Sequence, residues 1–171
     1  GDAGTAFIHV IELVRYYALL TEQAHGTVIL HSAAIRHRDS DHVVALVGAK
    51  GAGKTTTMLS LLATGDYVYF SGDKLLLDRA GAGLRVRGWP DYPHVGIGTL
   101  RDHPGLAQRL GVRLTADDGT PLPDRHKVLI DPARYLAAIG GTVQACGRLS
   151  RVILPRIHEG GRQTRFSPLG A

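Results

Sequence analysis

The chain has 171 residues and a mass of 18.3 kDa, with 44% hydrophobic and 20% charged residues. This length and balance are typical of one folded domain over residues 1–171 and exclude a disordered chain. Twenty Lys and Arg outnumber fifteen Asp and Glu, and the net charge of +5 favours an anionic ligand. We expect a polyphosphate rather than nucleic acid, because the basic residues are scattered and aromatic residues are few.

The number of cysteines and the distribution of hydrophobic residues indicate the cellular compartment of the protein. Cys146 is the single cysteine, which excludes an internal disulfide and a zinc site built from several thiolates. No hydrophobic stretch is long enough for a membrane span, and no signal-peptide pattern begins the sequence. We therefore expect a cytoplasmic protein that binds neither a membrane nor nucleic acid.

The first predicted elements are a helix and two strands. Hydrophobic residues recur at steps of three and four over Phe7–His25, which predicts an amphipathic helix that Gly26 ends. We expect this helix to pack on its own sheet or on a partner. Aliphatic and β-branched residues predict strands over Thr27–Ile35 and His42–Val47, and the polar turn between them favours an antiparallel hairpin.

The middle of the chain continues the alternation. A helix is predicted over Thr55–Ala63 and a strand over Tyr67–Phe70, followed by a hairpin with strands Lys74–Asp78 and Leu84–Gly88. Trp89–Thr99 is rich in Gly, Pro and aromatic residues, which predicts an irregular segment.

The rest of the chain contains five predicted segments. They are a short helix over His103–Leu110, a mobile polar loop over Thr115–Arg125, a strand over Lys127–Ile130, a helix over Pro132–Ile139 and a strand over Leu149–Pro155. The whole alternation predicts an α/β fold, a single compact domain with a mixed β-sheet and flanking helices.

The most specific motif is Gly48–Thr55, with the sequence GAKGAGKT, which satisfies the phosphate-loop pattern GxxxxGK[ST]. Its glycines allow the tight curvature that turns backbone N–H groups toward phosphate oxygens, and the following helix adds free N–H groups and a positive dipole end. We therefore predict that a purine nucleoside triphosphate, ATP or GTP, binds here with Mg²⁺. The predicted nucleotide-binding residues are Gly48, Lys50, Gly51, Ala52, Gly53, Lys54, Thr55 and Thr56.

Three side chains carry the expected phosphate and metal chemistry. Lys54 is expected to neutralise the β- and γ-phosphates, and the Thr55 hydroxyl to ligate Mg²⁺. Asp73 follows the strand Tyr67–Phe70, where a carboxylate for the metal shell belongs, and we favour this role over that of an ordinary turn aspartate. For Lys50 two interpretations stay open, a contact to the terminal phosphate or a solvent-exposed side chain.

The order of motifs over Val14–Asp73 resembles the HPr kinase/phosphorylase-like family, whose wider relatives include phosphoenolpyruvate carboxykinase. The resemblance rests on a helix, the strand segment Leu30–Ala34 with the sequence LHSAA, a hairpin, the phosphate loop and Ser71-Gly72-Asp73. It implies a P-loop kinase fold, with His31 near the reacting phosphate and Asp73 in the second acidic position. Members of the family often assemble, so the resemblance also implies a homo-oligomer.

Gly72 departs from the family pattern, because it stands at the first acidic position, which is associated with activating the acceptor hydroxyl. We predict an ATP-dependent kinase that transfers the γ-phosphate to a hydroxyl of a small molecule or a Ser-containing peptide or protein. Its catalytic residues are His31, Lys54 and Asp73, and His31 takes the proton if it is neutral near pH 7. The alternative is a non-catalytic nucleotide-binding module or a nucleotide-dependent switch, which the missing acid favours.

The acceptor is expected beside Gly88–Gly98, an irregular segment that follows the proposed metal carboxylate in sequence. Trp89 and Tyr92 are candidates for stacking on the acceptor. Asp91 is a candidate for a base on the acceptor side of the site. A purely structural Trp89 that caps the core is the slightly favoured alternative.

Overall fold

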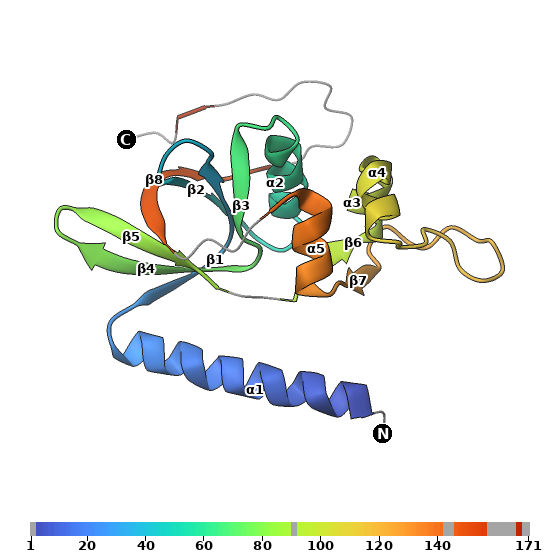
Figure 1. Ribbon diagram of the computed structural model, residues 1–171, viewed down its shortest axis with the longest axis horizontal. Helices are drawn as coiled ribbons and strands as arrows, with labels where there is room; N and C mark the ends of the chain where they lie inside the picture. Colours follow the sequence, from blue (N-terminus) through green and yellow to red (C-terminus); the bar gives the residue numbers. More distant parts are fainter. Residues whose placement is uncertain (1–2, 90–91, 142–145, 157–166, 169–171) are drawn as a thin grey trace.

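The computed structural model describes residues 3–89, 92–141, 146–156 and 167–168, and the predicted mixed α/β architecture is confirmed (Figure 1). In chain order the elements are α1 (Ala3–Ala24), β1 (Val28–His37), β2 (His42–Val47), α2 (Lys54–Leu62), β3 (Tyr67–Ser71), β4 (Lys74–Ala80), β5 (Gly83–Gly88), β6 (His94–Gly96), α3 (Ile97–Asp102), α4 (Pro104–Arg109), β7 (Lys127–Leu129), α5 (Pro132–Ile139) and β8 (Gly147–Ile153).

The main sheet has six strands in the order β2-β8-β5-β4-β1-β3. Because β1 also pairs with β2, the strands β1, β2, β8, β5 and β4 close a ring, and β3 extends from one edge of β1. The first residues of β1, Val28–His31, pair with β4, whereas Ser32–Arg36 pair with β2 on the other edge. Among the described strands only β2 and β8 run parallel, so the sheet is mixed.

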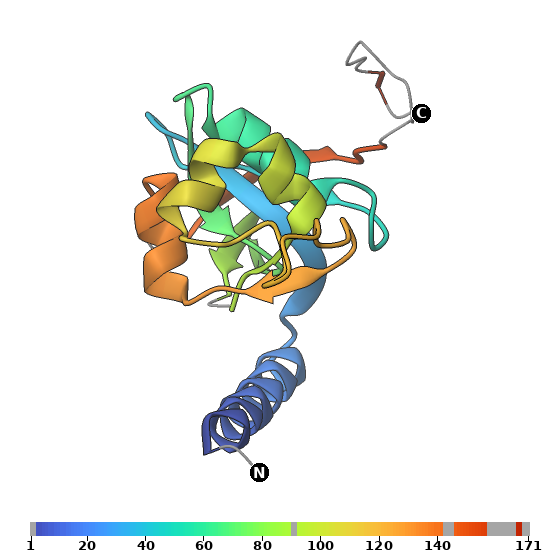
Figure 2. The same ribbon diagram turned by 90° about the vertical axis from the view of Figure 1, so that its right-hand side faces the viewer.

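Two groups of buried side chains fill the two faces of these strands. One group includes Ile35 and Leu46 and joins the sheet to side chains of α2, α3, α4 and α5, which Figures 1 and 2 show gathered on one side of the sheet. The other includes Ala34 and Ala45. Neighbouring residues of β1 and β2 fall into different groups, because successive side chains of a strand point to opposite faces.

Three predicted segments lie between residues 89 and 125, and the first of them differs from its predicted form whereas the helix and the loop that follow match theirs. Trp89–Thr99 is not wholly irregular, because His94–Gly96 form β6 and Ile97 begins α3. The helix predicted over His103–Leu110 is the second of two short helices. The loop Thr115–Arg125 contains no helix or strand and is drawn together by an isolated bridge between Thr115 and Pro121. Local sequence patterns do not predict β6, because its partner strand β7 lies far along the chain.

The first helix lies apart from the rest of the structure. Figures 1 and 2 show α1 running out from the end of β1, and only its last turns come close to the sheet. The predicted helix is therefore present, but it does not pack on its own sheet along most of its length. No helix formed by the described residues has the length and hydrophobicity needed to cross a membrane.

We predict that Gly147→Ala destabilises the fold by about 1–3 kcal/mol, because the added methyl group overpacks the junction of β8 and β2. A Cβ at Gly147 would lie 2.5 Å from Cγ2 of Val43 and 2.8 Å from the carbonyl oxygen of Asp41. Urea unfolding measures the change. Gly83→Ala is the matched control, because the nearest atom to a Cβ there is the Ala80 carbonyl oxygen at 3.9 Å. Equal stability of the two variants would contradict the prediction.

Candidate functional site

The segment Gly48–Thr55 joins the end of β2 to the first turn of α2, which is the strand–loop–helix context that the motif requires. Gly51 and Gly53 have φ angles of +86° and +90°, which side-chain-bearing residues rarely adopt. A Cβ at Gly48 would lie 3.0 Å from Cβ of Ala52, so the start of the loop approaches its middle closely. The curvature of the loop therefore depends on its glycines.

Lys54 reaches back across this loop. Its Nζ donates to the carbonyl oxygens of Gly48 (2.7 Å) and Ala49 (3.2 Å). Because an ammonium group has three donors, these two bonds leave a third N–H for an anion. Burial lowers the pKa of Lys54, as does the like charge of Lys127, while the carboxylate of Asp73 acts in the opposite direction. Lys54 and Asp73 are thus close enough to interact electrostatically.

Backbone pairing brings Asp73 to the beginning of the loop. The N–H of Ser32 donates to the carbonyl oxygen of Asp73 (2.9 Å), and Ser32 pairs with Val47, the last residue of β2. The neighbouring residue His31 pairs with Lys74. The three segments that the sequence analysis selected, around His31, Gly48 and Asp73, therefore meet at one end of the sheet.

The carboxylate of Asp73 lies between two basic side chains. Oδ1 is 3.1 Å from Nδ1 of His31, and Oδ2 is 2.6 Å from Nζ of Lys74. Burial favours a higher pKa for Asp73, but the hydrogen bond and charge of Lys74, with the charges of His31 and Lys54, outweigh it and lower the pKa. Asp73 is therefore ionised near neutral pH, which a ligand for a hard cation requires.

The other predicted binding residues have different environments. Thr55 is half-buried in the first turn of α2, and Lys50 is exposed in the loop. The hydroxyls of Thr56 and Thr99 lie 3.3 Å apart and share a hydrogen bond, which ties α2 to α3. The hydroxyl of Thr56 therefore contributes to packing, and the metal role of the Thr55 hydroxyl stays a prediction.

A magnesium ion fits this site only as a partly hydrated ion. Among the described residues, no group of three or more His, Cys, Asp and Glu side chains is arranged to hold a metal. Mg²⁺ commonly takes one or two carboxylates, keeps several waters and completes its shell with substrate phosphates. Asp73 and Thr55 match that donor set.

Gly72 lies against a buried tyrosine. A Cβ at Gly72 would be 2.9 Å from the hydroxyl oxygen of Tyr69, whose nearest ring carbon is 3.9 Å away. Tyr69 is 8% exposed and packs edge to face on Tyr135, with ring centroids 5.8 Å apart. A carboxylate at position 72 therefore requires the Tyr69 hydroxyl to move. The sequence shows that position 72 lacks an acidic residue, but not that the Tyr69 hydroxyl lies close to the position of a Cβ there.

Two lysines near the site were missed by the sequence analysis. Lys74 contacts Asp73 directly, and its position next to Asp73 in the chain was the available signal. Lys127 is the first residue of β7 and is near enough to Lys54 to lower its pKa. It has no local signal, because the pairing of β7 with β6 is what brings it to this end of the fold.

The segment predicted to border the acceptor begins beside Asp73. The N–H of Trp89 donates to the carbonyl oxygen of Lys74 (3.3 Å), and the Ser71 hydroxyl donates to the carbonyl oxygen of Trp89 (3.5 Å). Asp91 lies outside the described residues. A cavity of about 480 Å³ lies elsewhere, lined by residues 110–113, 115–117, 122, 128–131 and 134, and none of these is a predicted site residue.

The chain was also compared with known proteins. No protein-family model matches it, and no curated protein sequence matches it.

We predict that Asp73 titrates below the ordinary pKa of an aspartate, and that Lys74→Met raises its pKa, because the ammonium group at 2.6 Å stabilises the ionised form. NMR titration of the Asp73 carboxyl carbon measures both values. Since the folded-state pKa is lowered, this carboxylate stabilises the fold above the ordinary aspartate pKa, and the contribution is lost as the pH falls through the folded-state value. An unchanged Asp73 titration in the variant would contradict this assignment.

Proposed function

We propose that this chain binds a nucleoside triphosphate with Mg²⁺ at Gly48–Thr55 and transfers the γ-phosphate to an acceptor hydroxyl. The proposal includes a P-loop kinase fold similar to that of the HPr kinase/phosphorylase-like family. The observation that supports it most is the junction where Ser32 pairs with Val47 and bonds to Asp73, because it places the loop and the ionised carboxylate together. A glycine-rich turn without a ligand needs no such carboxylate.

Binding of the triphosphate relies on the loop and on Lys54. The backbone N–H groups of the loop and of the first turn of α2 surround the phosphates, and the remaining N–H of Lys54 donates to a phosphate oxygen. Asp73, the Thr55 hydroxyl and water would hold Mg²⁺, which would supply charge neutralisation to the phosphates. Asp73 has enough lone pairs to keep its contacts with His31 and Lys74 while it ligates a cation.

His31 in its neutral form supplies the proton acceptor in this proposal. Its Nδ1 lies 3.1 Å from a carboxylate oxygen of Asp73, which favours the tautomer with the proton on Nδ1. Nε2 is then free to accept the proton of the acceptor hydroxyl as the phosphate is transferred. The His31 side chain is 58% exposed, so an acceptor can reach it from solvent. The acceptor is a small molecule or a Ser-containing peptide or protein.

The crowding of Gly72 favours the alternative function, a non-catalytic nucleotide-binding module or switch. The fold places the Tyr69 hydroxyl where an acidic side chain at position 72 would begin, so the chain is built without that acid. In this alternative the loop binds nucleotide with Mg²⁺, and no acceptor is phosphorylated.

We predict that Lys54→Ala lowers phosphate transfer at least about 100-fold, because it removes the cation that faces the transferred phosphate. The assay follows labelled γ-phosphate from Mg-ATP, and from Mg-GTP in parallel, to hydroxyl-bearing metabolites and Ser-containing peptides. Arg79→Ala is the control, since Arg79 is an exposed cation of β4 outside the loop. Urea unfolding of both variants checks that the fold is retained.

The outcomes of this assay separate the hypotheses. Transfer to one acceptor class, lost in Lys54→Ala, supports the kinase. Nucleotide binding that Lys54→Ala abolishes, without transfer to any acceptor, supports the binding module or switch. If neither nucleotide binds in the presence of Mg²⁺, both functions are wrong.

We predict that Gly72→Asp destabilises the wild-type fold by about 1–3 kcal/mol. In the background of Tyr69→Phe, the same Gly72→Asp substitution should cost much less stability. The physical reason is that removing the hydroxyl leaves the nearest ring carbon 3.9 Å from the new Cβ, which is ordinary contact. Thermal or urea unfolding of the four proteins gives the coupling between the two positions. Additive effects would show that Tyr69 does not crowd position 72.

A further inference from the structure

The exposed side of α1 carries large hydrophobic side chains. Each of them is 41–63% exposed, which is unusual for a run of such residues on one helix. They are Val10, Leu13, Val14, Tyr16, Tyr17 and Leu20. The less exposed side is also partly hydrophobic, with Ile11, Ala18 and Leu19 half-buried. A helix with hydrophobic residues on most of its circumference is typically covered by other protein.

Seven hydrophobic residues of α1 fall at the spacing of a heptad repeat. They alternate steps of three and four along the whole helix, which is the spacing of positions a and d in a coiled coil. The series is Ala3, Ala6, Val10, Leu13, Tyr17, Leu20 and Ala24. The helix has 22 residues, which gives three heptads and a length of about 33 Å. A partner helix of similar length is therefore the shape that fits this face.

Charge supports a partner with the same sequence. In this register the flanking positions e and g are Phe7, Val14, Thr21, His9, Tyr16 and Gln23, none of which is an acid, a lysine or an arginine. Charges at e and g normally decide which helices pair, and like charges there prevent self-association. The charged residues Glu12, Arg15 and Glu22 lie at positions c and f, away from the seam. Two copies of α1 therefore meet without repulsion.

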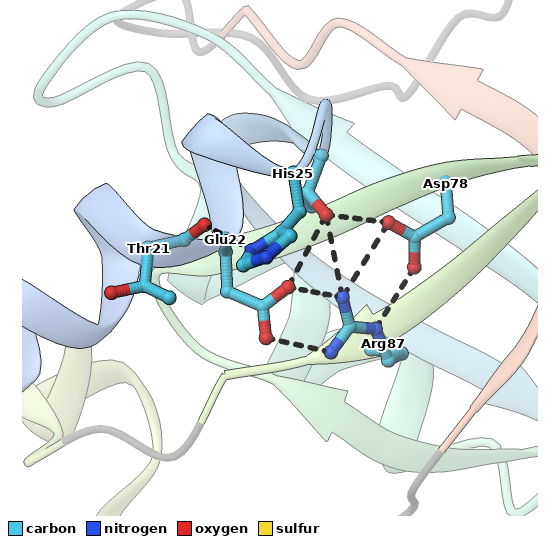
Figure 3. Close-up of polar contacts among 6 residues, drawn as sticks. Thr21, Glu22, His25, Asp78 and Arg87 are labelled. Atoms are coloured by element: carbon cyan, nitrogen blue, oxygen red, sulfur yellow. Dashed lines mark hydrogen bonds and ion pairs between the residues drawn. The ribbon is translucent and has the colours of Figure 1, made fainter.

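The C-terminal end of α1 is anchored to the sheet by an ionic cluster (Figure 3). The Arg87 guanidinium of β5 donates to both carboxylate oxygens of Glu22 (2.9 and 2.5 Å) and, through Nε, to Asp78 of β4 (2.9 Å). The Thr27 hydroxyl donates to Asp78 (2.7 Å). Glu22 lies at position f, so the anchor holds α1 from the side opposite the a and d residues and leaves the seam exposed.

We propose that α1 forms a coiled coil with α1 of a second copy of this chain, which makes the protein a homodimer. The heptad repeat supplies the complementary shape, the uncharged flanks permit self-pairing, and the Arg87 cluster fixes the last turn of α1 with the a and d residues exposed. This dimer is independent of the nucleotide site, and it holds whether the chain is a kinase or a binding module.

The test measures the mass of the full chain by sedimentation equilibrium over a range of concentrations. We expect the mass of two 18.3 kDa chains, and we expect Leu13→Glu to raise the dissociation constant at least about 10-fold, because it places a charge in the seam. Leu19→Glu is the matched control, since Leu19 lies about 120° around the helix at position c. A monomeric wild-type chain, or equal weakening by both variants, overturns the proposal.

A cross-linking experiment keeps the proposal testable if Leu13→Glu unfolds the protein. Cys146 is exposed and is replaced in Cys146→Ser, and Leu13→Cys or Leu19→Cys is then added. Leu13 is near the middle of α1, so its counterpart lies in the same layer of a parallel pair and in an adjacent layer of an antiparallel pair. Oxidation should link two chains through Cys at position 13 and not at position 19. Failure to link at position 13, or equal linking at both positions, overturns the proposal.

Discussion

The pairing of β1 with three other strands is the constraint on which both the fold and the candidate site depend. This strand has ten residues, long enough to pair with β4 at its beginning, with β2 along its second half and with β3 on its other edge. The change from one partner to another occurs at His31 and Ser32. His31 pairs with Lys74 and Ser32 pairs with Val47. The end of β2 and the carboxylate of Asp73, next to Lys74 in the chain, therefore lie side by side at that point.

Electrostatics at this junction follows from the same geometry. Asp73 is partly buried, which by itself opposes ionisation, yet three basic groups surround it and keep it charged. Lys54 is held by the carbonyl oxygens of its own loop and is partly desolvated. The site thus joins one ionised carboxylate to a cluster of cations, an arrangement that suits a phosphate with a bound divalent ion.

The helix α1 has a different relation to the fold from that of the other helices. The helices α2 to α5 bury their hydrophobic side chains against the sheet, whereas α1 is attached by its last turn through Arg87. The periodicity of its sequence predicts a helix with a hydrophobic face but not the direction in which that face points. Its direction depends on Glu22, Asp78 and Arg87, which lie far apart in the sequence and meet only in the folded chain.

The sequence by itself determined the elements and the chemistry of the loop, because both depend on local patterns. A continuous hydrophobic run defines β2, helical spacing of hydrophobic residues defines α2, and the glycines with Lys54 and Thr55 define the loop between them. The tertiary structure decided what depends on distant pairing: the short strand β6, the approach of Lys127 to Lys54, and the position of the Tyr69 hydroxyl against Gly72. A glycine at position 72 is visible in the sequence, but the space beside it is not, since packing between β3 and α5 fixes where Tyr69 lies.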